Sequence, residues 1–322
     1  MKIVDSVYGV EEIEDDVLID LINSKNIQRL KGVAQGGLPA RYCAQPVFSR
    51  YDHSVGVMVL LRKIGADLNE QIAGILHDLS HTTFSHLIDW VIGDPKKQNY
   101  QDNQYGKVLR NSDCAKILEK HSFDVLDFID IEKYKLLERE TPDLCADRID
   151  YCLRDLVARG RKKFSNEFIK HLIIHNGEIV FDSEPIAYQF AHEFLSLQNY
   201  SWAEVIHSTR FSIFAEVLKR ALSLEIINRN DFEGVDEDIL EKLENSKDSE
   251  ILGKLKIVKK GFTLKFSSKG IEIRDKFRFV DPKVFSDGQL KRVSEFSPYY
   301  SEFVNFSRSY FNSRKFVEVF SK

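Results

Sequence analysis

Three histidines and one aspartate fall within ten residues of a chain that contains nine histidines in all. They are His77, Asp78, His81 and His86. Because residues 68–76 repeat apolar side chains at helical spacing, they predict an amphipathic helix that ends near His77. The adjacent His-Asp pair offers an imidazole nitrogen and a carboxylate oxygen, which suit a first-row divalent metal. Polar residues are also ordinary at a helix end, so a metal site requires further ligands elsewhere in the chain.

The composition predicts a globular protein with a substantial core. The chain has 322 residues, of which 43% are hydrophobic, and a formal net charge of -4. This balance favours neither nucleic acid nor a membrane surface as a general partner. We find no signal peptide and no apolar run of the roughly 18 residues that a membrane span needs. The four cysteines show no CxxC spacing, which favours free thiols and a cytoplasmic location.

Most of the chain carries the pattern of helices. Glycine and proline separate the segments, and Asn176-Gly177 predicts a hairpin turn. Residues 185–226 are rich in aromatic side chains, which are more often core than cofactor contacts. The predicted elements are helices at 15–34, 50–64, 68–76 and 87–92, an exposed loop at 93–107, two helices within 108–140, a helix at 141–155, a hairpin at 171–181 and helices within 185–226.

The predicted helix 141–155 has two different faces. Cysteine, isoleucine and leucine form an apolar stripe, and Asp147, Tyr151, Arg154 and Asp155 lie opposite. Spacing alone favours a solvated face, since charged faces usually lie at the surface. The alternative is a polar wall of a pocket.

The composition changes near residue 228. Residues 231–250 hold nine acidic side chains against two lysines, and residues 251–283 hold ten basic side chains against three acidic ones. Residues 271–279 alternate apolar and charged side chains, with Glu272, Arg274, Lys276 and Arg278 on one side. This alternation predicts a strand with one wet face. Such a face is usually only solvated, but it could also bind an anionic partner.

Five segments, in order, resemble motifs of one enzyme family. They are Asp5-Ser6-Val7-Tyr8-Gly9, Gln28-Arg29-Leu30 with Gln35, Arg50-Tyr51-Asp52-His53-Ser54-Val55-Gly56, His77 to His86, and Asp147 with Tyr151, Arg154 and Asp155. Together they resemble the HD superfamily of metal-dependent phosphohydrolases, and within it the deoxynucleoside triphosphate triphosphohydrolases. The resemblance covers residues 1–215. It implies a mainly α HD-domain helical bundle with small β-hairpins. The change of composition places a boundary near residue 228, so we expect this HD core with accessory helices at 1–227 and a C-terminal α+β subdomain of unknown role at 228–322.

The resemblance implies a set of four metal ligands: His53, His77, Asp78 and Asp147. It moves Asp147 from a solvated face into the pocket. Two imidazoles and two carboxylates nearly neutralise a dication and leave positions open for water and a phosphate oxygen. Mixed nitrogen and oxygen ligation does not choose among Mn, Fe, Zn, Mg and Ni.

The resemblance also implies roles around a nucleotide substrate. Arg50 would hold the α-phosphate, and Arg148 and Arg210 would neutralise the outer phosphates. Gln35 would bind the sugar hydroxyl, and Tyr151 and Asp155 would line the sugar pocket. For proton transfer, His86 with Asp89 would form the general acid/base pair. His81 would contact a phosphate.

This chain departs from the family pattern at three positions. The family usually has a His-Glu pair where the nearest match here is Gln101-Asp102, and an amide cannot shuttle a proton. Leu218 stands where an aromatic side chain is frequent, which affects the expected preference for the base. Gly36 replaces a bulkier residue beside Gln35, which could relax discrimination against ribonucleotides.

These residues lead to one preferred function and two alternatives. The preferred function is hydrolysis of (deoxy)nucleoside triphosphates by metal-bound water at the α-phosphorus, which gives nucleoside and tripolyphosphate. One alternative is a phosphodiesterase or nuclease that acts on cyclic nucleotides or single-stranded nucleic acid, with the basic segment near 254–278 guiding the nucleic acid strand. The other alternative is a nucleotide sensor with slow turnover. Gln101 is consistent with it, because an amide cannot shuttle a proton. The resemblance further suggests a homodimer or higher oligomer through the helices at 185–226.

Overall fold

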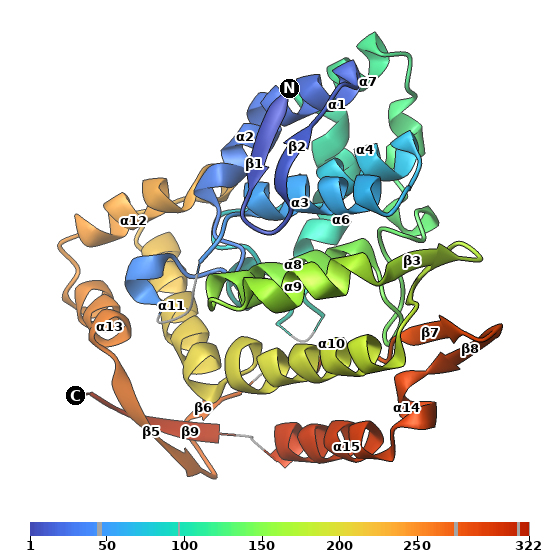
Figure 1. Cartoon of the computed structure of the whole chain (residues 1–322). Helices are drawn as coiled ribbons and strands as arrows, with labels where there is room; N and C mark the ends of the chain where they lie inside the picture. Colours follow the sequence, from blue (N-terminus) through green and yellow to red (C-terminus); the bar gives the residue numbers. More distant parts are fainter. Residues whose placement is uncertain (44–46, 96, 274–275, 314–315, 322) are drawn as a thin grey trace.

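The protein is described by a computed structural model that covers residues 1–43, 47–95, 97–273, 276–313 and 316–321. It is mainly α-helical, with small β-sheets, and this confirms the predicted fold class. Figure 1 shows the helices gathered in one body, with the C-terminal elements along one side. The helices are α1 (Asp16–Asn23), α2 (Lys25–Arg29), α3 (Arg50–Lys63), α4 (Leu68–Leu76), α5 (Leu87–Val91), α6 (Tyr100–Arg110), α7 (Asp113–Lys120), α8 (Ala146–Ala158), α9 (Lys162–Lys170), α10 (Glu184–Leu197), α11 (Val205–Ser223), α12 (Asp236–Glu244), α13 (Ser249–Lys260), α14 (Val293–Phe296) and α15 (Pro298–Ser313).

Helix α3 packs closely against α8 at the centre of the body. A Cβ atom at Gly56 would lie only 1.7 Å from Nη2 of Arg154, so no larger residue fits there without a shift. The N-terminus of α3 is closed by a capping box in which Ser49 is the N-cap and Asp52 is the third helical residue. Asp52 is therefore the partner of the cap, and His53 lies in the first turn of α3.

The strands form three small sheets. The Asn176-Gly177 hairpin is confirmed: both residues have positive φ, and β3 pairs with β4 in antiparallel register. Two later strands extend this sheet, because β7 pairs in parallel with β4 and β8 pairs with β7. The strands are β1 (Lys2–Asp5), β2 (Gly9–Glu12), β3 (Leu172–His175), β4 (Glu178–Phe181), β5 (Phe262–Ser267), β6 (Ile271–Glu272), β7 (Lys283–Ser286), β8 (Gln289–Arg292) and β9 (Phe316–Ser321).

The C-terminal third contributes to both apolar clusters of the protein. Val280, Val284 and Tyr300 belong to the larger cluster, together with side chains of α3 and α8. Phe232 belongs to the second cluster, with Phe84 and residues of α11. The segment after residue 228 therefore packs into the helical body, and the proposed boundary there stays a prediction.

The aromatic side chains of α10 and α11 are mostly core. Phe190, Phe194 and Phe214 are fully buried, whereas Tyr200, in the turn after α10, is 74% exposed. An oligomer through this region stays a prediction. Within the described ranges, no helix has the length and apolarity that a membrane crossing requires.

Four local predictions were wrong. The expected helix at 15–34 is divided at Ser24, whose backbone is extended, into α1 and α2. The expected loop at 93–107 contains the start of α6, with Gln101 and Tyr105 buried. Helix α8 begins at Ala146 and not at Thr141, because the backbone N–H of Ala146 bonds to the carbonyl of Leu136 over 2.8 Å. Of the predicted strand 271–279, the described residues form a strand only at Ile271–Glu272, which is β6.

Candidate metal centre

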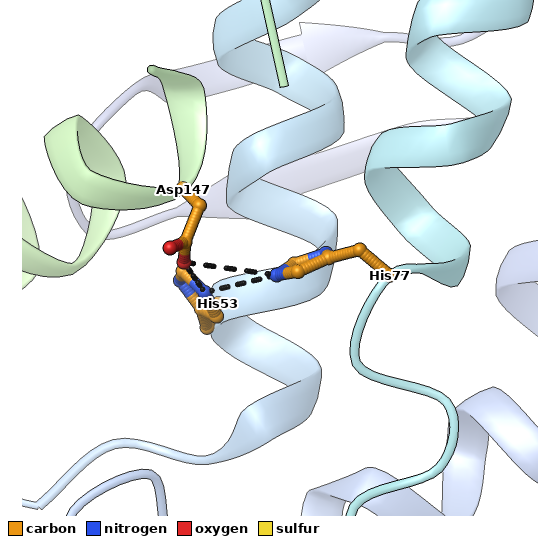
Figure 2. A group of neighbouring side chains, drawn as sticks. All are labelled: His53, His77 and Asp147. Atoms are coloured by element: carbon orange, nitrogen blue, oxygen red, sulfur yellow. Dashed lines mark hydrogen bonds and ion pairs between the residues drawn. The ribbon is translucent and has the colours of Figure 1, made fainter. Parts of the chain in front are cut away.

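Three elements bring the predicted metal ligands together. His53 comes from the first turn of α3, His77 caps the end of α4, and Asp147 comes from the first turn of α8. Nε2 of His53 lies 2.9 Å from Oδ1 of Asp147 and 3.2 Å from Nε2 of His77. Figure 2 shows the three side chains pointing toward one another from separate helices. The solvated face that spacing favoured for Asp147 is therefore wrong.

The hydrogen-bond pattern of the two imidazoles fits a metal ion. Nδ1 of His77 donates to the carbonyl of Gly74 over 2.7 Å, and Nδ1 of His53 donates to Oδ2 of Asp150 over 2.8 Å. In the neutral rings both Nε2 atoms then carry lone pairs, and they face each other across 3.2 Å. A cation between them would use both lone pairs and the Asp147 carboxylate. The donor set of imidazole and carboxylate suits a first-row divalent metal.

The pKa shifts of His53 and Asp147 also indicate a site that binds positive charge. Burial opposes a charged His53, but its bonds to Asp147 and Asp150 outweigh burial and raise the pKa of His53 to about 9. For Asp147, burial is outweighed by its bonds to His53 and His77, which lower the pKa of this carboxyl. The cluster thus attracts positive charge, here supplied by protons and equally well by a metal.

Asp78 borders the same cluster. Its Oδ1 lies 3.5 Å from Nε2 of His77, and its Oδ2 lies 3.7 Å from Nε2 of His53. Both oxygens also have other partners: Oδ2 accepts from Nη1 of Arg50 at 2.8 Å, and Oδ1 lies 3.2 Å from Nε2 of His81. Its role as a fourth ligand stays a proposal.

A second set of possible metal ligands lies near the first, but a cationic side chain already binds it. Glu138, Cys145 and Asp147 also have ligand atoms close together. However, Nη2 of Arg148 donates to Glu138 over 2.9 Å, and its Nη1 lies 3.2 Å from the sulfur of Cys145. A guanidinium therefore provides the positive charge of this group.

Sequence analysis did not identify Asp150, whose carboxylate accepts a hydrogen bond from Nδ1 of His53, the ring nitrogen that does not face Asp147. The second oxygen of Asp150 accepts from the hydroxyl of Tyr8 over 2.7 Å, and Arg154 binds both Asp150 and Asp5. This network explains the motif Asp5 to Gly9, since the turn between β1 and β2 closes it. Position 150 is one helical turn beyond Asp147, which was the one available signal.

The His-rich loop is strained and held by later parts of the chain. Phe84 and Ser85 have φ values of 58° and 49°, which non-glycine residues rarely adopt. The carboxylate of Asp236 accepts the backbone N–H of Phe84 over 2.7 Å and that of Ala34 over 2.9 Å. The guanidinium of Arg29 binds the carbonyls at positions 79, 81 and 234. We call Arg29, Phe232 and Asp236 the loop brace, because Thr83 also donates to the carbonyl of Phe232.

A pocket of ≈ 200 Å³ opens beside the cluster. One part is aromatic and apolar, and another carries cationic side chains and His86. The lining residues are Gln35, Gly36, Leu38, Cys43, Val47, Phe48, Arg50, His86, Trp90, Gln98, Tyr151, Asp155, Ser201, Trp202, His207, Phe211, Lys276 and Arg278.

Five of the predicted substrate and catalytic residues line this pocket: Gln35, Arg50, His86, Tyr151 and Asp155. Arg50 is fixed by Asp78 and by the hydroxyl of Ser85 at 3.0 Å. Asp155 accepts a hydrogen bond from the indole of Trp202. Oε1 of Gln35 is buried without a partner among the described residues, as expected of a group that binds a ligand.

The other predicted contacts lie outside this lining. Arg148 is engaged with Glu138, as described above, and the guanidinium of Arg210 lies 5.9 Å from the ring centre of Phe262. His81 is buried against Asp78, and burial and the charge of Arg50 lower its pKa to about 3. The phosphate contacts of these three residues stay predictions. Leu218 is buried in the second apolar cluster, whereas Gly36 lines the pocket.

The surroundings of His86 differ from the expected pair with Asp89. Oδ2 of Asp89 lies 3.7 Å from Nδ1 of His86, and its other oxygen accepts the backbone N–H of Tyr100. The side-chain amide of Gln101 lies closer and donates to Nδ1 of His86 over 2.9 Å. The amide thus fixes the ring with Nε2 as its N–H side, and burial lowers the pKa of His86.

Comparison with known proteins agrees with this site. Residues 50–155, which hold all four predicted ligands, match the family model described as HD domain. The chain is 35% identical over 299 residues to the uncharacterized protein YdhJ of Bacillus subtilis, covering 91% of each chain. It is 40% identical over 157 residues to the metal-dependent phosphohydrolase cns2 of Cordyceps militaris, covering 49% of this chain and 45% of that one.

More distant likenesses extend over most of the chain. The Dictyostelium discoideum homologue of the deoxynucleoside triphosphate triphosphohydrolase SAMHD1 is 24% identical over 334 residues, covering 89% of this chain and 61% of that one. A solved phosphohydrolase structure from Bacteroides thetaiotaomicron superposes with a TM-score of 0.74 at 18% identity and full coverage of both chains, which shows the shared fold. With the converging histidines and aspartates, these likenesses show that the chain belongs to the HD-domain family of metal-dependent phosphohydrolases.

Proposed function

We propose that this phosphohydrolase acts on (deoxy)nucleoside triphosphates and cleaves at the α-phosphorus to give nucleoside and tripolyphosphate. The observation that carries the proposal is the position of Arg50. Its guanidinium lines the pocket and also binds Asp78 at the edge of the metal centre. A phosphate bound to Arg50 would therefore lie between the metal centre and the rest of the pocket.

The pocket lining suits the remainder of a nucleotide. Trp90, Phe211 and Trp202 provide flat apolar surfaces on which a base can stack. Gln35 and Asp155 add polar groups for sugar hydroxyls. The distant relative named as a deoxynucleoside triphosphate triphosphohydrolase supports the same substrate class.

The chemistry divides between the metal and the side chains. A divalent cation held by His53, His77 and Asp147 would lower the pKa of water and neutralise phosphate charge. Arg50 would orient the α-phosphate through a charge-assisted bond. Nε2 of His86 would hold or deliver a proton at the leaving oxygen, since Gln101 occupies its Nδ1.

A product assay tests this proposal. The purified protein, loaded with Mn²⁺ or Mg²⁺, is incubated with a panel of ribo- and deoxyribonucleoside triphosphates, and tripolyphosphate is measured. We expect tripolyphosphate and nucleoside in equal amounts, and no product from the Asp147→Ala variant. Monophosphates released from oligonucleotides or cyclic nucleotides would identify a phosphodiesterase or nuclease instead. Thermal stabilisation by nucleotides without product would identify a sensor.

A further inference from the structure

Two cations in the pocket come from the C-terminal segment, which the family motifs do not reach. Lys276 and Arg278 line the pocket together with Arg50. Arg50 is balanced by Asp78 at 2.8 Å. In contrast, no carboxylate of the described ranges forms an ion pair with Lys276 or Arg278. Among the residues that line the pocket, Arg50, Lys276 and Arg278 outnumber the single carboxylate of Asp155, so the lining contains more positive than negative charge.

Separate contacts hold the side chain of Arg278 and the backbone of Lys276. Nη2 of Arg278 donates to Oε1 of the buried Gln98 over 2.7 Å, and the carbonyl of Lys276 accepts from Gln198 over 3.2 Å. The intervening Phe277 and the following Phe279 stack on each other, and the guanidinium of Arg308 on α15 lies over both rings. Among residues 276–279 the predicted alternation therefore persists outside a strand: Phe277 and Phe279 contact α15, and the two cations line the pocket. Arg274 lies outside the described residues.

The expected binders of the outer phosphates lie elsewhere. Arg148 is held by Glu138 over 2.9 Å and by backbone carbonyls, and Arg210 lies against Phe262. Neither is among the residues that line the pocket. We infer that Lys276 and Arg278 bind the outer phosphates of the substrate in this protein. This inference rests on the proposed function and names the residues that recognise the polyphosphate.

The electrostatics of the pocket support this assignment. Partial burial of the ammonium and repulsion from Arg278 lower the pKa of Lys276, although the carboxylates of Asp102 and Glu138 act in the opposite direction. Like charges held near one another raise the free energy of the empty pocket, and a polyanion would relieve that repulsion. A monophosphate would reach Arg50 alone, whereas a chain of three phosphates would also reach the C-terminal cations.

A binding experiment that does not depend on turnover tests the inference. The probes are inorganic tripolyphosphate and inorganic phosphate, titrated by calorimetry into Mn²⁺-loaded, dialysed protein. The variants are Lys276→Gln, Arg278→Gln and the double variant. A charge-assisted contact contributes about 10-fold or more in affinity, so we expect about 10-fold weaker tripolyphosphate binding in each single variant and about 100-fold in the double variant. Phosphate binding should change less than about 3-fold by the same reasoning.

Two further variants act as controls. Lys269→Gln removes an exposed lysine of the same C-terminal segment outside the pocket and should bind like the wild type. Arg278→Lys keeps the charge but loses the planar contact with Gln98, so it should recover part of the affinity. Thermal unfolding of every variant confirms that the fold is retained.

The binding measurements test the inference, and a separate assay of nucleotide hydrolysis by the wild type tests the proposed function. Unchanged tripolyphosphate affinity in the double variant would overturn the inference while nucleotide hydrolysis still supported the proposed function. Loss of tripolyphosphate affinity, with no hydrolysis of any nucleotide by the wild type, would support the anion site and reject the proposed function. Wild-type protein that binds neither probe would overturn the inference.

Discussion

Oδ2 of Asp150 lies 2.8 Å from Nδ1 of His53, and both side chains are fully buried. The carboxylate fixes the ring so that Nε2 faces His77 and Asp147. A carboxylate behind a metal-binding histidine raises the basicity of the imidazole and sets its tautomer. A residue outside the predicted set of ligands thus orients His53 toward the other members of the candidate metal centre.

Replacing Asp150 with asparagine should weaken metal binding about 10- to 100-fold, because the amide keeps the shape but loses the charge. Metal content after dialysis against increasing chelator measures the effect. Asp130→Asn, at an exposed carboxylate, is the matched control. Wild-type metal affinity in Asp150→Asn, with the fold retained, would show that the carboxylate has no such role.

The metal-free protein should lose stability as the pH rises. The folded-state pKa of His53 is raised to about 9, whereas an unfolded histidine titrates near about 6.5. The stabilisation from protonated His53 is therefore complete below about pH 6.5 and is lost as the pH rises through 9. It amounts to about 3 kcal/mol at most.

Urea unfolding in EDTA from pH 6 to pH 9.5 measures this loss. His53→Gln, which lacks the titrating ring, provides the baseline. With Mn²⁺ in excess the trend should disappear, because the metal takes the place of the proton and stabilises the folded state by mass action. Equal slopes for the wild type and His53→Gln in EDTA would contradict the assignment.

Gln101→Glu should shift the pH profile of the reaction upward. Burial lowers the pKa of His86, and Gln101 offers Nδ1 only a neutral partner. A carboxylate at this position would stabilise the imidazolium, so the limb of kcat/KM that reports His86 should move up by about one pH unit. Asn103→Asp makes the same chemical change at an exposed position of α6 and should leave the profile unchanged. An unchanged pH profile would show that His86 does not transfer the proton.

Asp236→Ala should lower kcat about 10-fold or more while the metal content stays near that of the wild type. The carboxylate holds the N–H groups of Phe84 and Ala34, and so positions the loops that carry His86 and Gln35. A displacement of about 1 Å in such groups can cost about 100-fold in rate. Asp236→Asn, which keeps one acceptor, should recover part of kcat. Glu241→Ala, on the exposed side of α12, serves as the control.

Residues close together in the sequence could be predicted well. The amphipathic helix before His77, the hairpin at Asn176-Gly177 and the ligand types follow from local spacing and turn chemistry. The convergence of His53, His77 and Asp147 came from family resemblance, because spacing alone placed Asp147 on a solvated face.

Contacts that follow neither helical nor hairpin spacing could not be predicted. Glu138 holds Arg148 through a fold of the chain that no periodicity describes. Gln101 reaches His86 only because α6 begins where polar composition predicted a loop. The cations at 276 and 278 looked like a solvated face, since their partner surface comes from α3, α8 and α11. Such contacts depend on tertiary packing, which local patterns do not encode.

The loop brace also has a consequence for protein engineering. Because Arg29 holds carbonyls at positions 79, 81 and 234 at once, three distant segments of the chain meet at one side chain. A chimaera that exchanged everything after residue 227 for an unrelated tail would keep every metal ligand and Arg29, yet its His-rich loop would lose the contacts from Phe232 and Asp236. Grafting experiments in this family should therefore transfer residues 229–244 together with the catalytic half.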